Sequence, residues 1–88
     1  MVCFDPLQKK APEYHLQTTE TFLGVHGIGL IRLGPSGNNV RPLLPGDEIA
    51  VSPNTVYQLE NTDPHAPFCL LATLQPPFNP QDVYELSA

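Results

Sequence analysis

Residues 19–33 decide the fold class, and in one-letter code they read TETFLGVHGIGLIRL. Within this stretch, Thr19–His26 and Ile28–Leu33 are rich in β-branched, aromatic and aliphatic residues, so each run predicts a β-strand. Gly27 and Gly29 flank Ile28, which predicts a tight bend or a bulge between the two runs. The stretch therefore indicates two consecutive strands with a short connection.

The rest of the chain likewise consists of short apolar runs separated by turn residues. Eleven prolines and six glycines are spread over 88 residues, and a helical domain would not absorb them, because each interior proline costs about 3 kcal/mol. Further strands are expected at residues 9–16, 40–44, 48–52, 55–61 and 68–74. Asn79 as an N-cap and Pro80 at the first helical position predict a short helix over residues 80–86. Seven or so strands without a long helix indicate an all-β antiparallel sandwich or small barrel.

Length and charge limit the classes of protein that this chain can be. A chain of 88 residues and 9.7 kDa is expected to form a single domain, residues 1–88. Its net charge of −5 argues against a nucleic-acid partner and against an anionic membrane surface, because both need clustered cations. No apolar run approaches the roughly 18 residues of a spanning helix, and no signal peptide opens the chain.

The two cysteines lie far apart in the sequence, at Cys3 and Cys69. They form no CxxC pair and suggest no disulfide framework, so we expect each to be a small buried or half-buried apolar side chain. A reduced, cytoplasmic location follows as the expectation.

Three segments, taken in order, resemble the motifs of the cupin family. The family's first motif has a His-x-His pair, a Glu four or five positions later and a Gly seven beyond that; here His15 and Glu20 are five apart, and Gly27 lies seven beyond Glu20. Residues 45–47 (PGD) are similar to a common cupin turn. Residues 52–61 (SPNTVYQLEN) are similar to the second motif, which has a Pro, usually a Gly, then a His and an Asn four residues later.

The resemblance extends from about residue 10 to residue 86 and includes the closing segment 75–80 (QPPFNP). It implies an antiparallel cupin-like jelly-roll β-barrel, often a homodimer, with a metal ion held inside by the two motifs. The amino terminus is shorter than in typical members, so we expect one or two outer strands to be absent or to come from a partner. Glu13 stands where the first His of the pair is usual, and Tyr57 stands where the second motif has its His; His15 and Glu20 keep the family's residues.

Strand alternation tests the same geometry without the family. Glu13 and His15 share one face of their strand, because successive side chains in a strand point to opposite sides. A barrel with the matching faces of the other strands turned inward would bring four polar side chains together beside an apolar wall. These four are Glu13, His15, Glu20 and Tyr57.

The leading hypothesis from these residues is a small cupin that binds a divalent metal and acts on a small organic molecule. The expected ligands are Glu13, His15, Glu20 and Tyr57. One imidazole, two carboxylates and a phenol suit Fe, Mn, Ni, Zn or Cu, although an oxygen-rich set binds more weakly than three histidines.

Two metal-free alternatives stay open, and with them the question whether the protein is an enzyme. In the first, the barrel binds or senses a small molecule, and His15 merely hydrogen-bonds Glu20 or Tyr57. In the second, the protein is an isomerase or epimerase with His15 as general base and Tyr57 as general acid. Some cupins are sugar epimerases of that broad type. In each case we expect a small-molecule partner and a homodimer, because a small barrel gains stability by burying an edge strand against a copy of itself.

Overall fold

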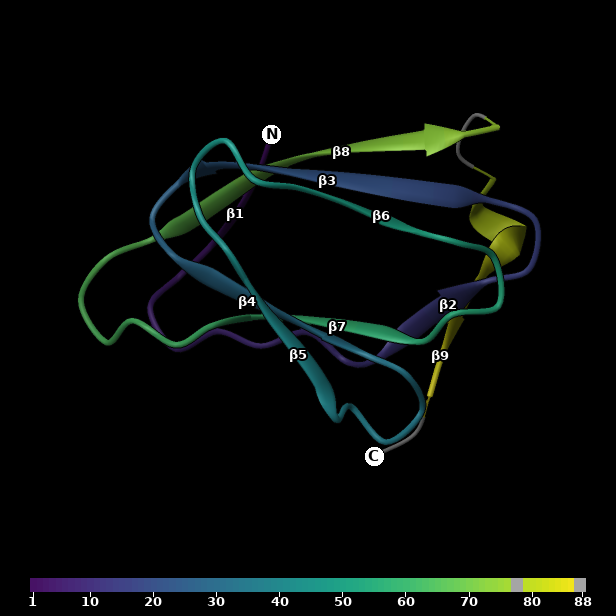
Figure 1. The fold of residues 1–88 in the computed structure, drawn as a ribbon, viewed down its shortest axis with the longest axis horizontal. Coiled ribbons are helices and arrows are strands. Elements are labelled where there is room, and N and C mark those ends of the chain that lie inside the picture. Colours follow the sequence, from purple (N-terminus) through teal and green to yellow (C-terminus); the bar gives the residue numbers. More distant parts are fainter. Residues whose placement is uncertain (77–78, 87–88) are drawn as a thin grey trace.

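Two antiparallel sheets face each other in the computed structural model, which describes residues 1–76 and 79–86 (Figure 1). Sheet A has four strands, in spatial order Val2–Phe4 (β1), Phe68–Gln75 (β8), Thr19–His26 (β3) and Glu48–Val51 (β6). Sheet B has five strands, in spatial order Asn39–Leu43 (β5), Gly29–Leu33 (β4), Tyr57–Asn61 (β7), Glu13–His15 (β2) and Val83–Glu85 (β9). The prediction of an all-β antiparallel fold is confirmed. No ladder in the described part of the chain joins the two sheets into a closed barrel.

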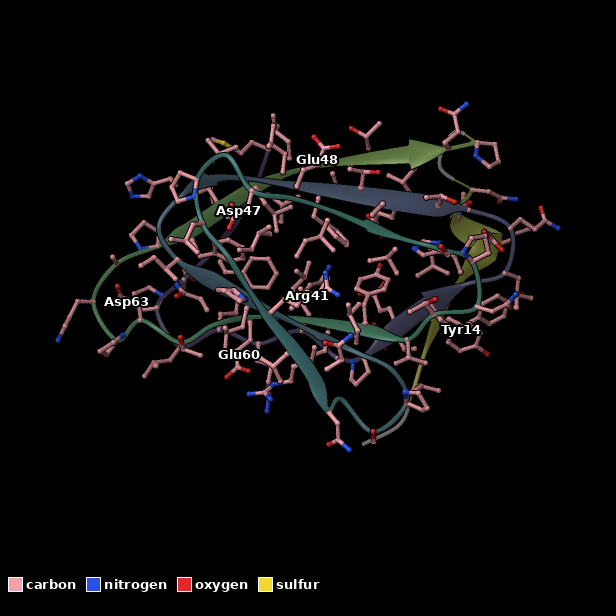
Figure 2. The ribbon with its side chains drawn as sticks, viewed as in Figure 1. Tyr14, Arg41, Asp47, Glu48, Glu60 and Asp63 are labelled. Atoms are coloured by element: carbon pink, nitrogen blue, oxygen red, sulfur yellow. A yellow bond between two sulfur atoms is a disulfide. The ribbon has the colours of Figure 1, made fainter. Side chains whose placement is uncertain are left out.

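Alternation along the strands builds the core. In sheet A, Phe22 and Leu70 point inward, and in sheet B Ile31 and Leu59 do the same; all four are buried. Side chains fill the space between the sheets (Figure 2). The core therefore lies between the two layers, as expected for strands with one buried face each.

The connection between β3 and β4 requires glycine at position 27. Gly27 has a φ of +75°, and a Cβ there would run into the carbonyl of Pro67. The tight bend predicted between these strands is thus confirmed. The Pro45-Gly46 turn also forms, with Gly46 at a φ of +89°, as a type II turn requires at its second central residue.

The strand predicted over residues 9–16 was too long. Only β2 forms there, together with an isolated bridge between Lys9 and Glu60. Pro12 precedes β2 and has no N–H to donate to a ladder. The strand predicted over residues 40–44 is displaced by one residue, and the others agree within two residues at each end.

The helix predicted over residues 80–86 was wrong beyond its first turn. Asn79 caps a three-residue 3₁₀ helix, Pro80–Asp82 (η1), and its side chain accepts a hydrogen bond of 3.0 Å from the Gln81 N–H. The chain then enters β9, which pairs with β2, because Val83 and Tyr84 are good strand formers with a partner at hand. Residues 77 and 78 of the closing segment lie outside the described residues. In the described part, no helix has the length and apolar character to cross a bilayer.

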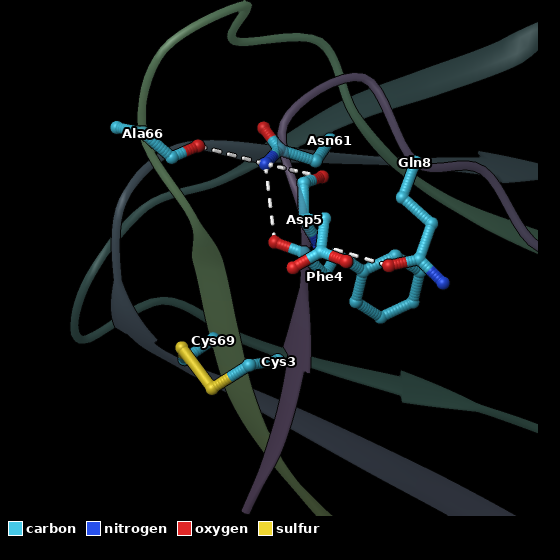
Figure 3. The surroundings of a disulfide bond; sticks show 7 residues. All are labelled: Cys3, Phe4, Asp5, Gln8, Asn61, Ala66 and Cys69. Atoms are coloured by element: carbon cyan, nitrogen blue, oxygen red, sulfur yellow. Dashed lines mark hydrogen bonds between the residues drawn. A yellow bond between two sulfur atoms is a disulfide. The ribbon is translucent and has the colours of Figure 1, made fainter.

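The expectation of two unpaired cysteines was wrong, because Cys3 and Cys69 form a disulfide (Figure 3). The sequence analysis assigned no strand to residues 2–4, yet these residues form β1 and pair with β8. The two cysteines face each other directly in that register, with their Cα atoms 4.1 Å apart. Because the two residues are directly opposed on paired strands, their side chains leave the sheet on the same face and the sulfur atoms can meet.

Candidate functional site

Three polar side chains from three strands meet between the sheets. The His15 Nε2 atom lies 3.2 Å from Glu20 Oε1 and 3.2 Å from the Tyr57 hydroxyl. The Tyr57 hydroxyl donates a hydrogen bond of 2.7 Å to Glu20 Oε1. All three residues are buried. We call His15, Glu20 and Tyr57 the polar triad.

The pairing of the strands determines where the three side chains of the triad lie. His15 ends β2 and lies opposite Val83 of β9. Glu20 lies near the start of β3, between Val51 and Leu74 on its two neighbouring strands. Tyr57 begins β7, so it reaches His15 from the same sheet, while Glu20 reaches both from the other sheet. The convergence predicted from alternation is confirmed for these three side chains.

The phenol of Tyr57 keeps its proton in this environment. Burial raises its pKa, and the hydrogen bond to Glu20 and the negative charges of Glu20 and Glu13 raise the pKa further. Tyr57 is therefore a hydrogen-bond donor at neutral pH. Glu20 Oε1 and His15 Nε2 both lie within hydrogen-bond distance of this hydroxyl.

Asp82 lies beside His15, near the Nδ1 atom of the ring, and the sequence analysis did not predict this contact. Its Oδ2 atom lies 3.9 Å from His15 Nδ1 and accepts a hydrogen bond of 2.9 Å from the Thr18 hydroxyl. The backbone N–H groups of Leu16 and Gln17 donate to the same carboxylate. Asp82 thus fixes the loop that follows His15 and places a negative charge beside the ring. The N-cap predicted at Asn79 gave the position of the helical turn that contains Asp82, but it did not predict that Asp82 lies beside His15.

The pKa of Asp82 falls below its ordinary value of 3.8. Burial by itself raises the pKa, but the hydrogen bonds from Thr18, Gln17 and Leu16 and the charge of His15 outweigh that effect. A carboxylate whose folded pKa is depressed stabilises the fold above its unfolded pKa, and this stabilisation is lost as the pH falls through the folded value.

We therefore expect acid to destabilise the wild type more than the Asp82→Asn variant. Urea midpoints measured from about pH 6 to about pH 2 should fall less steeply in the variant, because it has one acidic proton fewer to bind. Some slope will remain, since backbone N–H groups of His65 and Ala66 also lower the pKa of Asp63. Glu85→Gln, at an exposed position, is the control. Equal slopes for Asp82→Asn and the wild type would contradict the role given to Asp82.

The polar triad lines a cavity of about 550 Å³. Glu13 lines the same cavity, but its carboxylate turns to Lys10, with 3.7 Å between Oε1 and Nζ. Of the four predicted site residues, three are in mutual contact, and Glu13 lies next to them as the register partner of Tyr57. The cavity is within the usual size range for a small-molecule site.

The fit of a metal to these donors is partial. The mutual separations of 2.7–3.2 Å in the triad are shorter than the roughly 3.4 Å between ligands that each lie about 2.1 Å from a tetrahedral ion, and they are the distances of direct hydrogen bonds. In addition, the third donor is a protonated phenol, and no group of three or more His, Cys, Asp or Glu within residues 1–76 and 79–86 is arranged to hold a metal ion. The metal ligands Glu13, His15, Glu20 and Tyr57 stay a prediction.

Solved structures match most of this chain. An uncharacterised protein with a double-stranded β-helix domain from Klebsiella pneumoniae matches with a TM-score of 0.81 at 21% identity, over 98% of this chain and 70% of that one. CapF, a capsular polysaccharide assembling protein from Staphylococcus aureus, matches with a TM-score of 0.78 at 20% identity, over 99% of this chain and 26% of that one. A cupin-superfamily sugar phosphate isomerase from Silicibacter pomeroyi matches with a TM-score of 0.71 at 21% identity, over 82% of this chain and 45% of that one. No family model and no curated protein matches the sequence.

These matches establish the type of fold. The chain has a cupin-type fold, and the resemblance predicted from its motifs is confirmed at that level. It spans less than half the length of the isomerase and about a quarter of CapF. At identities of 20–21%, the likeness extends to the fold alone.

Proposed function

We propose that the protein is a small-molecule-acting cupin that moves a proton on a carbonyl compound held in the cavity above the polar triad. The observation that carries the proposal is the burial of a histidine, a carboxylate and a protonated phenol in mutual contact in the lining of a cavity. Titratable groups that converge in a pocket are typical of sites for acid–base chemistry. The likeness to a sugar phosphate isomerase supports the same class of substrate, a small molecule.

The residues take the following roles. Tyr57 turns its O–H from Glu20 to the carbonyl oxygen and donates a hydrogen bond there as negative charge develops, while His15 Nε2 removes a proton from the adjacent carbon, so an enolate forms. His15 then returns a proton to carbon, the carbonyl forms again, and the Tyr57 O–H donates once more to Glu20. Glu20 holds the phenol in place before and after the two steps, and Asp82 stabilises the positive charge that His15 acquires.

Proton exchange in D₂O tests this proposal without a known substrate. The protein is incubated with cyclohexanone, acetophenone, dihydroxyacetone and fructose 6-phosphate, and deuterium incorporation at the carbon next to the carbonyl is followed by NMR. We expect at least one probe to exchange faster with protein than in buffer. Tyr57→Phe or His15→Gln should then reduce the protein-dependent rate by about 100-fold or more.

Tyr84→Phe is the matched control, since Tyr84 is an exposed tyrosine that stacks on Tyr14 away from the triad. Its exchange rate should equal that of the wild type. Exchange no faster than buffer for all four probes, or an undiminished rate in Tyr57→Phe, would contradict the proposal.

A metal-bound site is the second candidate function, favoured by the convergence of three donor atoms. His15, Glu20 and Tyr57 would hold the ion, with Glu13 close by, and the ion would polarise a bound oxygen. Metal analysis of the same preparation, purified without chelator, distinguishes the candidates. About one equivalent of Fe, Mn, Ni, Zn or Cu supports the second, and less than about a tenth, with no uptake on addition, supports the first. Homodimerisation and a cytoplasmic location stay predictions.

A further inference from the structure

We infer that the cavity takes a neutral, largely apolar molecule with one carbonyl or hydroxyl group at its end, and that it disfavours sugar phosphates and other anions. The inference rests on the proposed function, because it names the substrate class for the same site. Three features of the cavity carry it: the apolar walls, the charge that surrounds it and the position of its polar groups.

Apolar side chains make up the walls. Ten of the fifteen described lining residues are Val, Leu, Phe, Ala or Pro. On the side of sheet A the wall includes Phe22, Ala72 and Leu74, and on the side of sheet B it includes Leu59 and Val83. Each square ångström of apolar ligand surface buried against such walls contributes about 25 cal/mol. A sugar, whose surface is mostly hydroxyl, would leave these groups without hydrogen-bond partners.

The charge around the cavity is negative. Glu13 and Glu20 line it, and Asp82 lies behind His15. Lys10 is the only lysine or arginine among the described lining residues, and its Nζ atom lies 3.7 Å from Glu13 Oε1. Arg32 is not among the described residues that line the cavity. Its guanidinium pairs with Glu60, with 3.2 Å between Nε and Oε1. Figure 2 shows Glu60 on the side of β7 away from sheet A.

This arrangement opposes a phosphate. A phosphate monoester carries a charge of about −1.5 to −2 at neutral pH and is usually bound by arginines, lysines or a helix N-terminus. Here it would meet the carboxylates of Glu13 and Glu20, and like charges repel each other. The Tyr57 hydroxyl instead offers a hydrogen-bond donor to one neutral oxygen of a ligand.

A pair of ligands with nearly the same shape tests whether the cavity disfavours a negatively charged ligand. Acetophenone and benzoate both carry a phenyl ring, and they differ in having a neutral acetyl group or a carboxylate. We expect acetophenone to bind at least about tenfold more tightly than benzoate or fructose 6-phosphate in calorimetric titrations. Glu13→Gln should raise the affinity for benzoate, because it removes one negative charge from the cavity.

Substitutions of two alanines in sheet A test whether the ligand binds in this cavity. Ala72 lies opposite Phe22 on the inner face, and Ala50 lies opposite Thr21 on the outer face. Ala72→Phe places a ring in the cavity and should weaken acetophenone binding by at least about tenfold. Ala50→Phe adds the same ring outside and should leave binding unchanged. Thermal unfolding of both variants establishes that each is folded, and Ala72→Leu replaces Ala72→Phe if the larger ring prevents folding.

The outcomes separate this inference from the proposed function. Tighter binding of benzoate or fructose 6-phosphate, or unchanged acetophenone binding in the folded Ala72 variant, overturns the inference. A protein that prefers anions and still exchanges protons through Tyr57 overturns the inference and leaves the proposed function intact. A protein that binds acetophenone at this site without exchanging protons supports the inference and contradicts the proposed function.

Discussion

Loss of the Cys3–Cys69 disulfide is expected to lower the free energy of unfolding by about 4 kcal/mol. The two residues are 66 positions apart, so the bond closes a loop of most of the chain, and loop-closure entropy in the unfolded state grows with loop length. The total stability of a chain of this size is about 5–13 kcal/mol. Removing the disulfide therefore takes away a large share of it.

Urea unfolding of the oxidised protein, of the protein reduced with a phosphine and of the Cys3→Ser/Cys69→Ser variant measures this loss. The reduced protein and the double variant should share one midpoint, well below that of the oxidised protein. Iodoacetamide should modify neither cysteine in unfolded, unreduced protein and both after reduction. Equal midpoints in all three samples, or alkylation without reductant, would show that the bond is absent or without effect.

Asn61→Ala is expected to cost about 3 kcal/mol, because it removes the hydrogen bonds that a fully buried side chain makes to four other residues. The Asn61 side chain is fully buried, and its Nδ2 group donates to the carbonyls of Phe4, Asp5 and Ala66 at 3.3, 3.1 and 2.9 Å (Figure 3). Its Oδ1 atom accepts a bond of 3.0 Å from the Asp63 N–H. This one amide therefore ties the end of β1 to the loop between β7 and β8.

Asn61→Asp separates these bonds from the volume of the side chain. The carboxylate keeps the acceptor and loses the donors, so this variant should be at least as destabilised as Asn61→Ala at neutral pH. Asn38→Ala, in an exposed loop, should change stability by less than about 0.5 kcal/mol. A cost for Asn61→Ala no larger than that of the Asn38 control would disprove the bridging role.

Much of the fold and the polar triad could be predicted because local rules determine them. Thr19–His26 forms a strand exactly where its composition predicts one. His15, Glu20 and Tyr57 converge because each lies on the inner face of a strand whose alternation is visible in the sequence. The motif spacing, which resembles that of cupins, gave their relative order along the chain.

The missed features depend on contacts between distant segments. Three residues are too few to show strand periodicity, so β1 and its disulfide were not foreseen. Asp82 reaches His15 only because β9 pairs with β2, and local propensity favoured a helix there. Strict alternation along β3 would place His26 on the face of Glu20, but an irregularity in the β3–β8 register between Gly24 and His26 interrupts the alternation, and His26 is exposed.

The cavity draws part of its lining from both ends of the chain, and this affects how the protein should be produced. Val2 and Phe4 come from the first strand, and Pro80 and Val83 come from the last elements. A change that displaces β1 or β9, such as a rigid fusion at either end of the chain, would therefore alter the walls of the cavity as well as the edges of the sheets. Binding measurements therefore call for tag-free protein or for a tag inserted in the exposed turn at residues 35–38, which contributes no lining residue among those described.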